Sequence, residues 1–224
     1  VVVSVRSWDW ISIVTKVYLL CCLYVAYAIC FPLLNVALSA LRKVIADMNL
    51  HFAIILVAVF LIGVLCFLCP TVPGMIVYIF AGILVADQCP PRNTDQGFWT
   101  GVVVNFALCW VLKLMACAIQ QVFIGGMLSK STWVRRTVGV HTTFIRCLEV
   151  VMRKKGLSPG KVAILCGGPD WPTSVLAGIM KLSLVECEIG TLPIIGFITP
   201  CGLTGSFYLK RGTTETWTRM ANAM

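Results

Sequence analysis

The stretch that decides the fold runs from His51 to Ala86 and reads HFAIILVAVFLIGVLCFLCPTVPGMIVYIFAGILVA. It carries no charged residue, and as one straight helix it would be about 54 Å long against a hydrocarbon core of about 30 Å. Pro70-Thr-Val-Pro73-Gly74 interrupts it, because two prolines remove backbone donors and glycine adds flexibility. We therefore expect two short helical arms that form a re-entrant hairpin, with two tilted short spans as the alternative.

The composition of the whole chain is that of a membrane protein. Of its 224 residues, 59% are hydrophobic and 12% are charged, and the mean hydropathy is +0.92. Soluble domains carry about 25% charged residues, so most of the outer surface is expected to face lipid. The net charge is +9, yet this composition cannot supply a soluble basic groove for nucleic acid. Membrane phospholipids with anionic head groups are therefore the expected partner.

The first segment, residues 1–50, is expected to hold one spanning helix and one helix in the membrane interface. Residues 17–38 form an uncharged apolar run that is followed by Arg42 and Lys43, as is typical of a spanning helix with a basic end. Residues 39–50 place apolar and charged side chains on opposite helix faces, which predicts a short amphipathic helix. Because the chain begins with valine rather than methionine, we expect it to be a piece of a longer protein.

A polar stripe marks the next predicted span, which follows a proline-containing loop at residues 87–97 and covers residues 98–124. Its polar side chains recur at spacings of three and four, which places them on one face of a helix. Polar groups are costly in lipid, so this face is expected to point into the protein. The stripe comprises Asn105, Cys109, Lys113, Cys117 and Gln120 or Gln121.

The segment 127–161 is strongly basic, with eight Lys and Arg residues and the single acid Glu149. Apolar residues from Val134 to Met152 repeat at four and three, which predicts one amphipathic helix with a basic outer face. The positive-inside rule places this linker in the cytoplasm, either solvated or lying on anionic lipid. The predicted headgroup contacts are Arg135, Arg136, Arg146, Arg153, Lys154 and Lys155.

A second broken stretch follows at residues 162–181. The run from Gly167 to Pro172 interrupts it, which predicts a second re-entrant element. Residues 182–209 form the last predicted span, kinked and closely packed because of its glycines and prolines, and residues 213–224 form a polar tail.

The two broken stretches share a pattern of prolines and glycines, which is typical of transport proteins built from inverted repeats. The predicted fold class is therefore an all-α membrane protein, a polytopic helical bundle with two re-entrant helical hairpins related as an inverted repeat. Its membrane domain is expected to cover residues 51–212. The shared pattern consists of Pro70, Pro73, Gly74 and Gly82 in the first stretch and Pro169, Pro172 and Gly178 in the second.

The site hypothesis is a hydrated groove between the two hairpins, along which a lipid head group moves. Lys113 lies well inside its predicted helix, where a charge needs a partner or water. A snorkelling lysine and an aspartate that caps a turn are the simpler interpretations of Lys113 and Asp170. The expected lining residues are Asn105, Lys113, Gln120, and Asp170 or Glu186.

Two sequence blocks lie on either side of the basic linker: Cys69-Pro-Thr-Val-Pro-Gly-Met75 with Ala81-Gly82, and Gly168-Pro-Asp-Trp-Pro172, Ala177-Gly-Ile-Met180 and Glu188-Ile-Gly-Thr191 with Pro193 and Gly196. These blocks resemble the DedA, or SNARE-associated Golgi protein (VTT-domain), family. The resemblance covers residues 60–212, includes the basic linker, and implies a helical membrane protein with two facing re-entrant hairpins. It further implies movement of lipids between leaflets, by eukaryotic endomembrane scramblases or by bacterial carriers of lipid-linked phosphates.

Departures from the family's pattern shape the functional expectation. Bacterial members that resemble proton-coupled carriers have acidic residues near the first hairpin and arginine around the second, whereas here the first hairpin is uncharged and a glycine precedes Pro169. We therefore expect passive lipid scrambling in an endomembrane such as the ER or Golgi, without enzymatic chemistry, a cofactor or a metal. The alternatives are an ion-gradient-driven transporter of a small anion or lipid-linked phosphate, and a structural subunit or adaptor. A homo-oligomer or larger membrane complex fits each of these.

Overall fold

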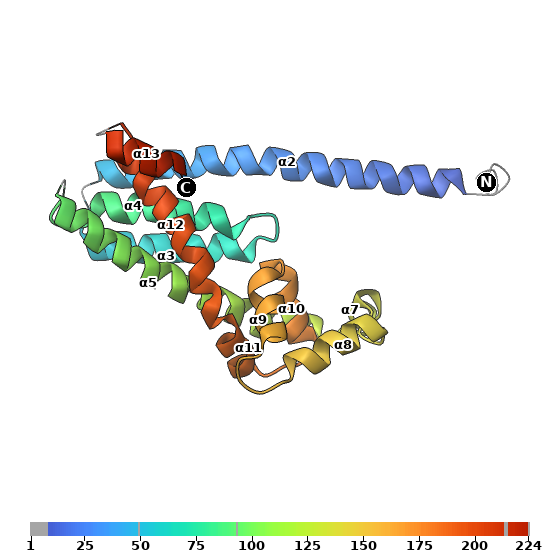
Figure 1. Ribbon diagram of the computed structural model, residues 1–224. Helices are drawn as coiled ribbons and strands as arrows, with labels where there is room; N and C mark the ends of the chain where they lie inside the picture. Colours follow the sequence, from blue (N-terminus) through green and yellow to red (C-terminus); the bar gives the residue numbers. More distant parts are fainter. Residues whose placement is uncertain (1–8, 49, 93, 213–214, 224) are drawn as a thin grey trace. The chain divides into compact units, whose positions relative to one another are not determined.

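The computed structural model describes residues 9–48, 50–92, 94–212 and 215–223, and their secondary structure is helical (Figure 1). The chain divides into two units, residues 1–44 and residues 45–224. Each unit is described by itself below.

The N-terminal unit consists largely of one long helix, α2 (Trp10–Asp47, 38 residues), which contains Pro32. The sequence predicted a span at 17–38 followed by a separate interfacial helix at 39–50. The predicted separation is wrong, because α2 continues without a break from the first segment into the second. No glycine or proline stands between Pro32 and Asp47 to end the helix. Several side chains between residues 23 and 35 lie outside the described part of the chain.

The uncharged stretch forms two helices, α3 (Phe52–Leu68, 17 residues) and α4 (Gly74–Gln88, 15 residues), so the predicted break is confirmed. The His51 side chain caps α3 by accepting a hydrogen bond from the Ala53 amide. Side chains of α4 are buried on most sides, as is typical of an apolar helix inside a bundle. After the break, α4 therefore packs in the interior of the bundle.

A helix at the predicted position, residues 98–124, is confirmed, and it is longer than expected. It is built from α5 (Asp95–Ile119), a π-helical turn η1 (Gln120–Gly125) and α6 (Gly126–Leu128). Together these form a continuous apolar helix of 34 residues, long enough to cross a membrane. The predicted polar stripe is buried along this helix, so its expected inward orientation is confirmed.

A second helix that is long and apolar enough to cross a membrane runs from Leu184 to Lys210, at the position of the predicted last span. It comprises α11 (Leu184–Thr191), the 3₁₀ turn η2 (Leu192–Ile194) and α12 (Ile195–Lys210). Among the described residues these two helices meet the length and composition needed to span a bilayer, which is compatible with membrane association.

Close backbone contact joins α12 to α4 (Figure 1). A methyl group on Gly82 would strike the Gly202 carbonyl, and one on Gly205 would strike the Ile79 carbonyl. The Ser206 hydroxyl donates a hydrogen bond to the Gly82 carbonyl at 3.1 Å. The close packing predicted for the last span is thereby confirmed.

The basic linker differs from its prediction, because it holds two helices, α7 (Thr132–Val138) and α8 (Thr143–Met152), in place of one. The chain turns at Gly139, whose φ of 73° is a left-handed conformation that ends α7. The hydrophobic period continues across this turn, so periodicity alone could not place the break. α8 packs onto the bundle through Met152.

The second broken stretch forms α9 (Pro159–Gly167) and α10 (Asp170–Ile179). The break is shorter than predicted, because it holds only Gly168 and Pro169. Pro172 lies in the first turn of α10, where a proline costs no intrahelical hydrogen bond.

The predicted polar tail at 213–224 is a helix over its described part, α13 (Glu215–Ala223). Trp217 packs its ring 5.4 Å from Phe98 and 5.6 Å from Phe207, centroid to centroid. Nearby, the Lys210 ammonium lies 3.5 Å from the Asp95 carboxylate. The start of α5 therefore lies beside the end of α12, so these helices are antiparallel with an aromatic cluster at one end, as is typical of a membrane interface.

Candidate functional site

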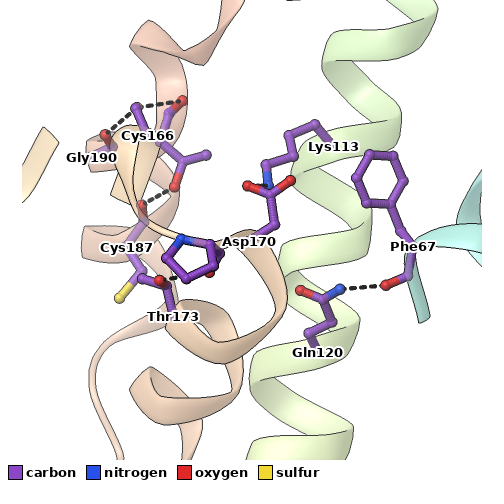
Figure 2. Close-up of polar contacts among 10 residues, drawn as sticks. Phe67, Lys113, Gln120, Cys166, Asp170, Thr173, Cys187 and Gly190 are labelled. Carbon is purple, nitrogen blue, oxygen red and sulfur yellow. Dashed lines mark hydrogen bonds and ion pairs between the residues drawn. The ribbon is translucent and has the colours of Figure 1, made fainter. Parts of the chain in front are cut away.

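The two helix breaks meet at the end of α3, where side chains from other helices bind its last carbonyl groups. The Gln120 amide donates to the Phe67 carbonyl at 2.6 Å (Figure 2), and the Trp171 indole donates to the Leu68 carbonyl at 3.3 Å. The last carbonyl groups of a helix have no intrahelical donor, and here side chains of other helices supply the donors. The first break is thus tied to η1 and to the second break.

An ion pair lies at this meeting point. The Lys113 ammonium is 2.6 Å from the carboxylate of Asp170, the first residue of α10 (Figure 2). The Lys113 side chain is 1% exposed, whereas the Asp170 side chain is 30% exposed. Lys113 also lies 5.7 Å from the centroid of the Phe67 ring, a cation–π distance. The simpler interpretation of a snorkelling lysine is therefore wrong.

Gly74 brings the first break against the same carboxylate. A methyl group built on Gly74 would lie 3.1 Å from an Asp170 carboxylate oxygen and closer still to the Phe67 ring. Only a residue without a side chain allows this approach. The start of α4 and the start of α10 therefore face each other across Asp170.

Several buried polar atoms in the described part of the same bundle have no hydrogen-bond partner. Tyr78, Asn105 and Gln120 are each at most 1% exposed, yet the Tyr78 hydroxyl, the Asn105 amide nitrogen and the Gln120 amide oxygen have no hydrogen-bond partner among the described residues. The rings of Tyr78 and Phe67 are 5.6 Å apart. Unsatisfied buried polar groups are rare in folded proteins and point to a bound molecule or to a change of state. The structure thus places the predicted Lys113 and Gln120 beside Phe67 at the first break. Asn105 lies 15 residues before Gln120 on the same helix, about 20 Å away, with Cys109 and Gly202 as neighbours.

Glu188 is a site residue that the sequence analysis missed. One of its carboxylate oxygens is buried without a partner, and the carboxylate interacts electrostatically with Lys113. Asp170 is the carboxylate that pairs with Lys113, at 2.6 Å, whereas Glu188 is a second carboxylate without an ion pair among the described residues. Its place in the sequence block that resembles the DedA family was the available signal.

Glu186 does not join this site, contrary to one of the two predicted options. Its carboxylate accepts hydrogen bonds from the Lys161 ammonium at 3.0 Å and from the Gly156 amide at 2.9 Å. Lys161 is fully buried and also donates to the Lys154 carbonyl. Residues two apart on a helix point in nearly opposite directions, so Glu186 and Glu188 cannot both face Lys113. Glu186 instead fixes the linker to the start of α11.

The two glycines after the breaks serve helix packing. Gly82 lies against Gly202 of α12, and Gly178 lies against the Gln121 carbonyl and Gly125 of η1. Each helix that follows a break therefore uses a glycine of its own to pack against one of the two long helices. Pro70 and Pro73 lie in the first break, and Pro169 is the N-cap of α10.

The predicted headgroup contacts lie on the surface of the basic linker. Arg135, Arg136, Arg146, Lys154 and Lys155 are exposed, and Arg153 binds Glu149 at 2.7 Å. Trp133 and Phe144 are each 72% exposed beside these bases. Large exposed aromatic side chains are unusual on a solvated linker and common where a protein meets the membrane interface.

No protein-family profile, no curated protein and no solved structure matches this chain. The resemblance to the DedA family therefore stays a prediction, and the functional argument depends on the geometry of the site. Within the described residues no group of three or more His, Cys, Asp or Glu side chains could hold a metal ion.

Proposed function

We propose that this chain is an integral membrane protein of the DedA/VTT type that lets phospholipids cross passively between leaflets. The observation that carries the proposal is the buried Lys113–Asp170 pair at the meeting of two helix breaks. Charges inside an apolar bundle are costly, and they are typically retained along substrate pathways. The basic linker is placed on the cytoplasmic side of an endomembrane.

The proposal includes α3–α4 and α9–α10 as re-entrant hairpins related as an inverted repeat. At 1.5 Å per residue, α3 and α4 are about 26 and 23 Å long, shorter than a hydrocarbon core of about 30 Å. The start of α3 and the end of α4 line one pocket, which supports entry and exit on the same side. The carbonyl groups at the end of α3 are bound by protein side chains, which allows a helix to end at membrane depth.

Lys113 is the group that would bind a lipid phosphate on its path. The partly exposed Asp170 carboxylate is the mobile partner, because it stands at the start of a helix that follows a break. When Asp170 turns away, the lysine ammonium and the Tyr78 hydroxyl become donors for phosphate oxygens. Scrambling needs only such a polar path for the head group, while the acyl chains stay in lipid, and no cofactor takes part.

Reconstitution in liposomes tests this function. Purified protein should equilibrate a fluorescent phospholipid between leaflets without an ion gradient, as measured by quenching from outside. Lys113→Leu should slow this exchange at least about tenfold, since an embedded charge partner is removed. Lys130→Leu is the matched control, because Lys130 is exposed beyond the end of α6. Equal rates for both variants and the original chain would contradict the site.

A gradient-driven secondary transporter of a small anion or lipid-linked phosphate is the second candidate. The unpartnered Glu188 oxygen favours it, because a buried carboxylate without an ion pair among the described residues could bind a proton or a sodium ion. Uptake that requires a proton or sodium gradient and is lost in Glu188→Gln would support this candidate. If the reconstituted chain showed neither scrambling nor gradient-driven uptake, the result would favour a structural subunit.

A further inference from the structure

The end of α3 carries two cysteines, Cys66 and Cys69, which stand three residues apart in a Cys-x-x-Cys pattern. Among the twelve cysteines of the chain they are the one pair with this spacing. Proteins that exchange thiols and disulfides use the same spacing. Whether the two sulfur atoms can bond depends on the turn that joins them.

The turn between the two cysteines has the geometry that a disulfide requires. The Cys69 amide donates a hydrogen bond to the Cys66 carbonyl at 3.1 Å, which closes a turn of the 3₁₀ type. Side chains at the two ends of such a turn lie on the same side, and their Cα atoms are about 6 Å apart. Disulfide bonds join Cα atoms that are about 4.4–6.8 Å apart. A bond between the two sulfur atoms is therefore within reach of the backbone as it stands.

The two thiols differ in exposure and in surroundings. Cys69 is exposed, whereas Cys66 is half-buried. The Cys69 sulfur lies 3.1 Å from the Thr71 hydroxyl oxygen. A hydroxyl group that donates to sulfur stabilises the thiolate, which is the reactive form of cysteine. Cys69 is therefore placed to attack an oxidant, and Cys66 is placed to complete the disulfide.

A disulfide at this position would enclose the two residues that tie the first break to its neighbours. Phe67 and Leu68 lie between the two cysteines, and their carbonyl groups accept the hydrogen bonds of Gln120 and Trp171. A covalent bridge across four residues leaves this turn fewer conformations. Its closure thereby fixes the end of α3 against η1 and α10.

We propose that Cys66 and Cys69 form a reversible thiol–disulfide site that reacts with low-molecular-weight disulfides such as oxidised glutathione. The Cys69 thiolate attacks one sulfur of the oxidant, whose sulfur–sulfur bond breaks and releases one thiolate. Cys66 then attacks the mixed disulfide at the Cys69 sulfur and releases the second thiolate. The released thiolates take up the two protons of the cysteines. Two cysteines are thus oxidised, and one oxidant disulfide is reduced to two thiols.

Incubation of the purified chain in detergent with oxidised glutathione, followed by mass spectrometry of proteolytic fragments, tests the site. The original chain should form an internal disulfide between residues 66 and 69 that dithiothreitol reverses. In Cys66→Ser the mixed disulfide has no second thiol to resolve it, so Cys69 should keep one glutathione. In Cys69→Ser, Cys66 should react at least about fivefold more slowly than Cys69 does, because it is half-buried. Two free thiols, or glutathione adducts without the internal disulfide, in the original chain would overturn the proposal.

The Thr71 hydroxyl group gives a separate test of the mechanism. Thr71→Val keeps the shape of the side chain and should slow the reaction of Cys69 at least about threefold, because the thiolate loses its donor. Thr100→Val is the matched control, because Thr100 is an exposed residue of α5 whose hydroxyl donates to the Gln96 carbonyl. Equal rates in the two variants would overturn the activation of Cys69 by Thr71.

Hydrogen exchange measures whether the disulfide fixes the break. The Cys69 amide and the last amides of α3 should exchange at least about threefold more slowly in the oxidised chain, because the turn opens less often. Reduction should restore the original rates, and Cys69→Ser treated with the same oxidant should show no change. Exchange that is the same in the oxidised and reduced chain would overturn the fixing of the break.

Control of the lipid path by this disulfide rests on the proposed function. Chain that is oxidised in detergent and then reconstituted should scramble phospholipid at least about threefold more slowly than reduced chain, because the break moves less. Equal scrambling rates in the two states would overturn this control. If the reduced chain moves no lipid at all, the proposed function fails, whereas the fragment masses and the hydrogen exchange still decide the disulfide site.

Discussion

The Lys113 ammonium lies 2.6 Å from the Asp170 carboxylate, and this contact joins the last third of α5 to the first residue of α10. The lysine is buried and the aspartate is partly exposed, so the two partners depend on the pair to different extents. Removing one member of a buried pair leaves the other uncompensated, which typically costs 3–5 kcal/mol. The free energy of unfolding should therefore fall when one member of this pair is removed.

Asp170→Asn should destabilise the chain by about 3 kcal/mol, because it leaves the fully buried Lys113 without a carboxylate partner. Lys113→Met should cost less, since Asp170 can still reach water. The double variant should be more stable than Asp170→Asn alone, because both charges are then gone. Thermal unfolding in detergent measures this, with Asp95→Asn at the exposed Lys210 pair as a control expected to be near neutral. Additive effects of the two substitutions would contradict the coupling.

Gly82→Ala should destabilise the chain by about 1–3 kcal/mol, because the added methyl group meets the Gly202 backbone and forces α4 away from α12. Gly196→Ala is the matched control, for which we expect an increase in stability instead of a decrease. Gly196 lies in α12 with open space around it, so alanine should stabilise the helix by about 0.5–1 kcal/mol. Unfolding midpoints that shift in the same direction would show that α4 and α12 do not pack this closely.

Gln120→Leu should destabilise the chain by about 1–3 kcal/mol, because the Phe67 carbonyl then has no donor at the buried end of α3. Gln96→Leu, the same change at an exposed position of α5, should have little effect. Hydrogen exchange should also become faster at the last amides of α3 in the first variant alone. If the two variants behave alike, Gln120 does not hold the break.

The basic linker should contact anionic membranes through α8. Cys147 is an exposed native thiol in this helix, and it can carry an environment-sensitive fluorophore once the other cysteines are replaced. Its emission should move to shorter wavelength in liposomes with anionic lipid, but not in purely zwitterionic ones. Replacing Arg135, Arg136 and Arg146 by Gln should abolish the shift, since each base contributes about 1 kcal/mol near such a surface.

High salt provides an independent control for the linker. The Debye length falls from about 10 Å at 0.1 M to about 3 Å at 1 M ionic strength, so an electrostatic contact should weaken. Emission that stays the same in anionic and zwitterionic liposomes, or that ignores salt, would identify a solvated linker.

The breaks and the buried stripe could be predicted because they depend on local chemistry. Pro70 and Pro73 remove two backbone donors within four residues, which interrupts the helix, and polar residues at spacings of three and four share a face in any helix. The turn at Gly139 was missed because the hydrophobic period continues across it, and a single glycine within a period does not always end a helix. The continuity of α2 was missed for the converse reason, since a change of polarity does not break a helix.

The sequence by itself determined where apolar helices form, where they break and which face of α5 is polar, since hydrophobicity, proline and helical period act over a few residues. Only the tertiary structure decided which charges meet. Glu186 and Glu188 have the same chemistry, yet the packing of α11 pairs Glu186 with Lys161 and buries an oxygen of Glu188 without a hydrogen-bond partner among the described residues. Such pairing depends on how helices distant in sequence are rotated and shifted against each other, and glycine contacts such as Gly178 on η1 set that position.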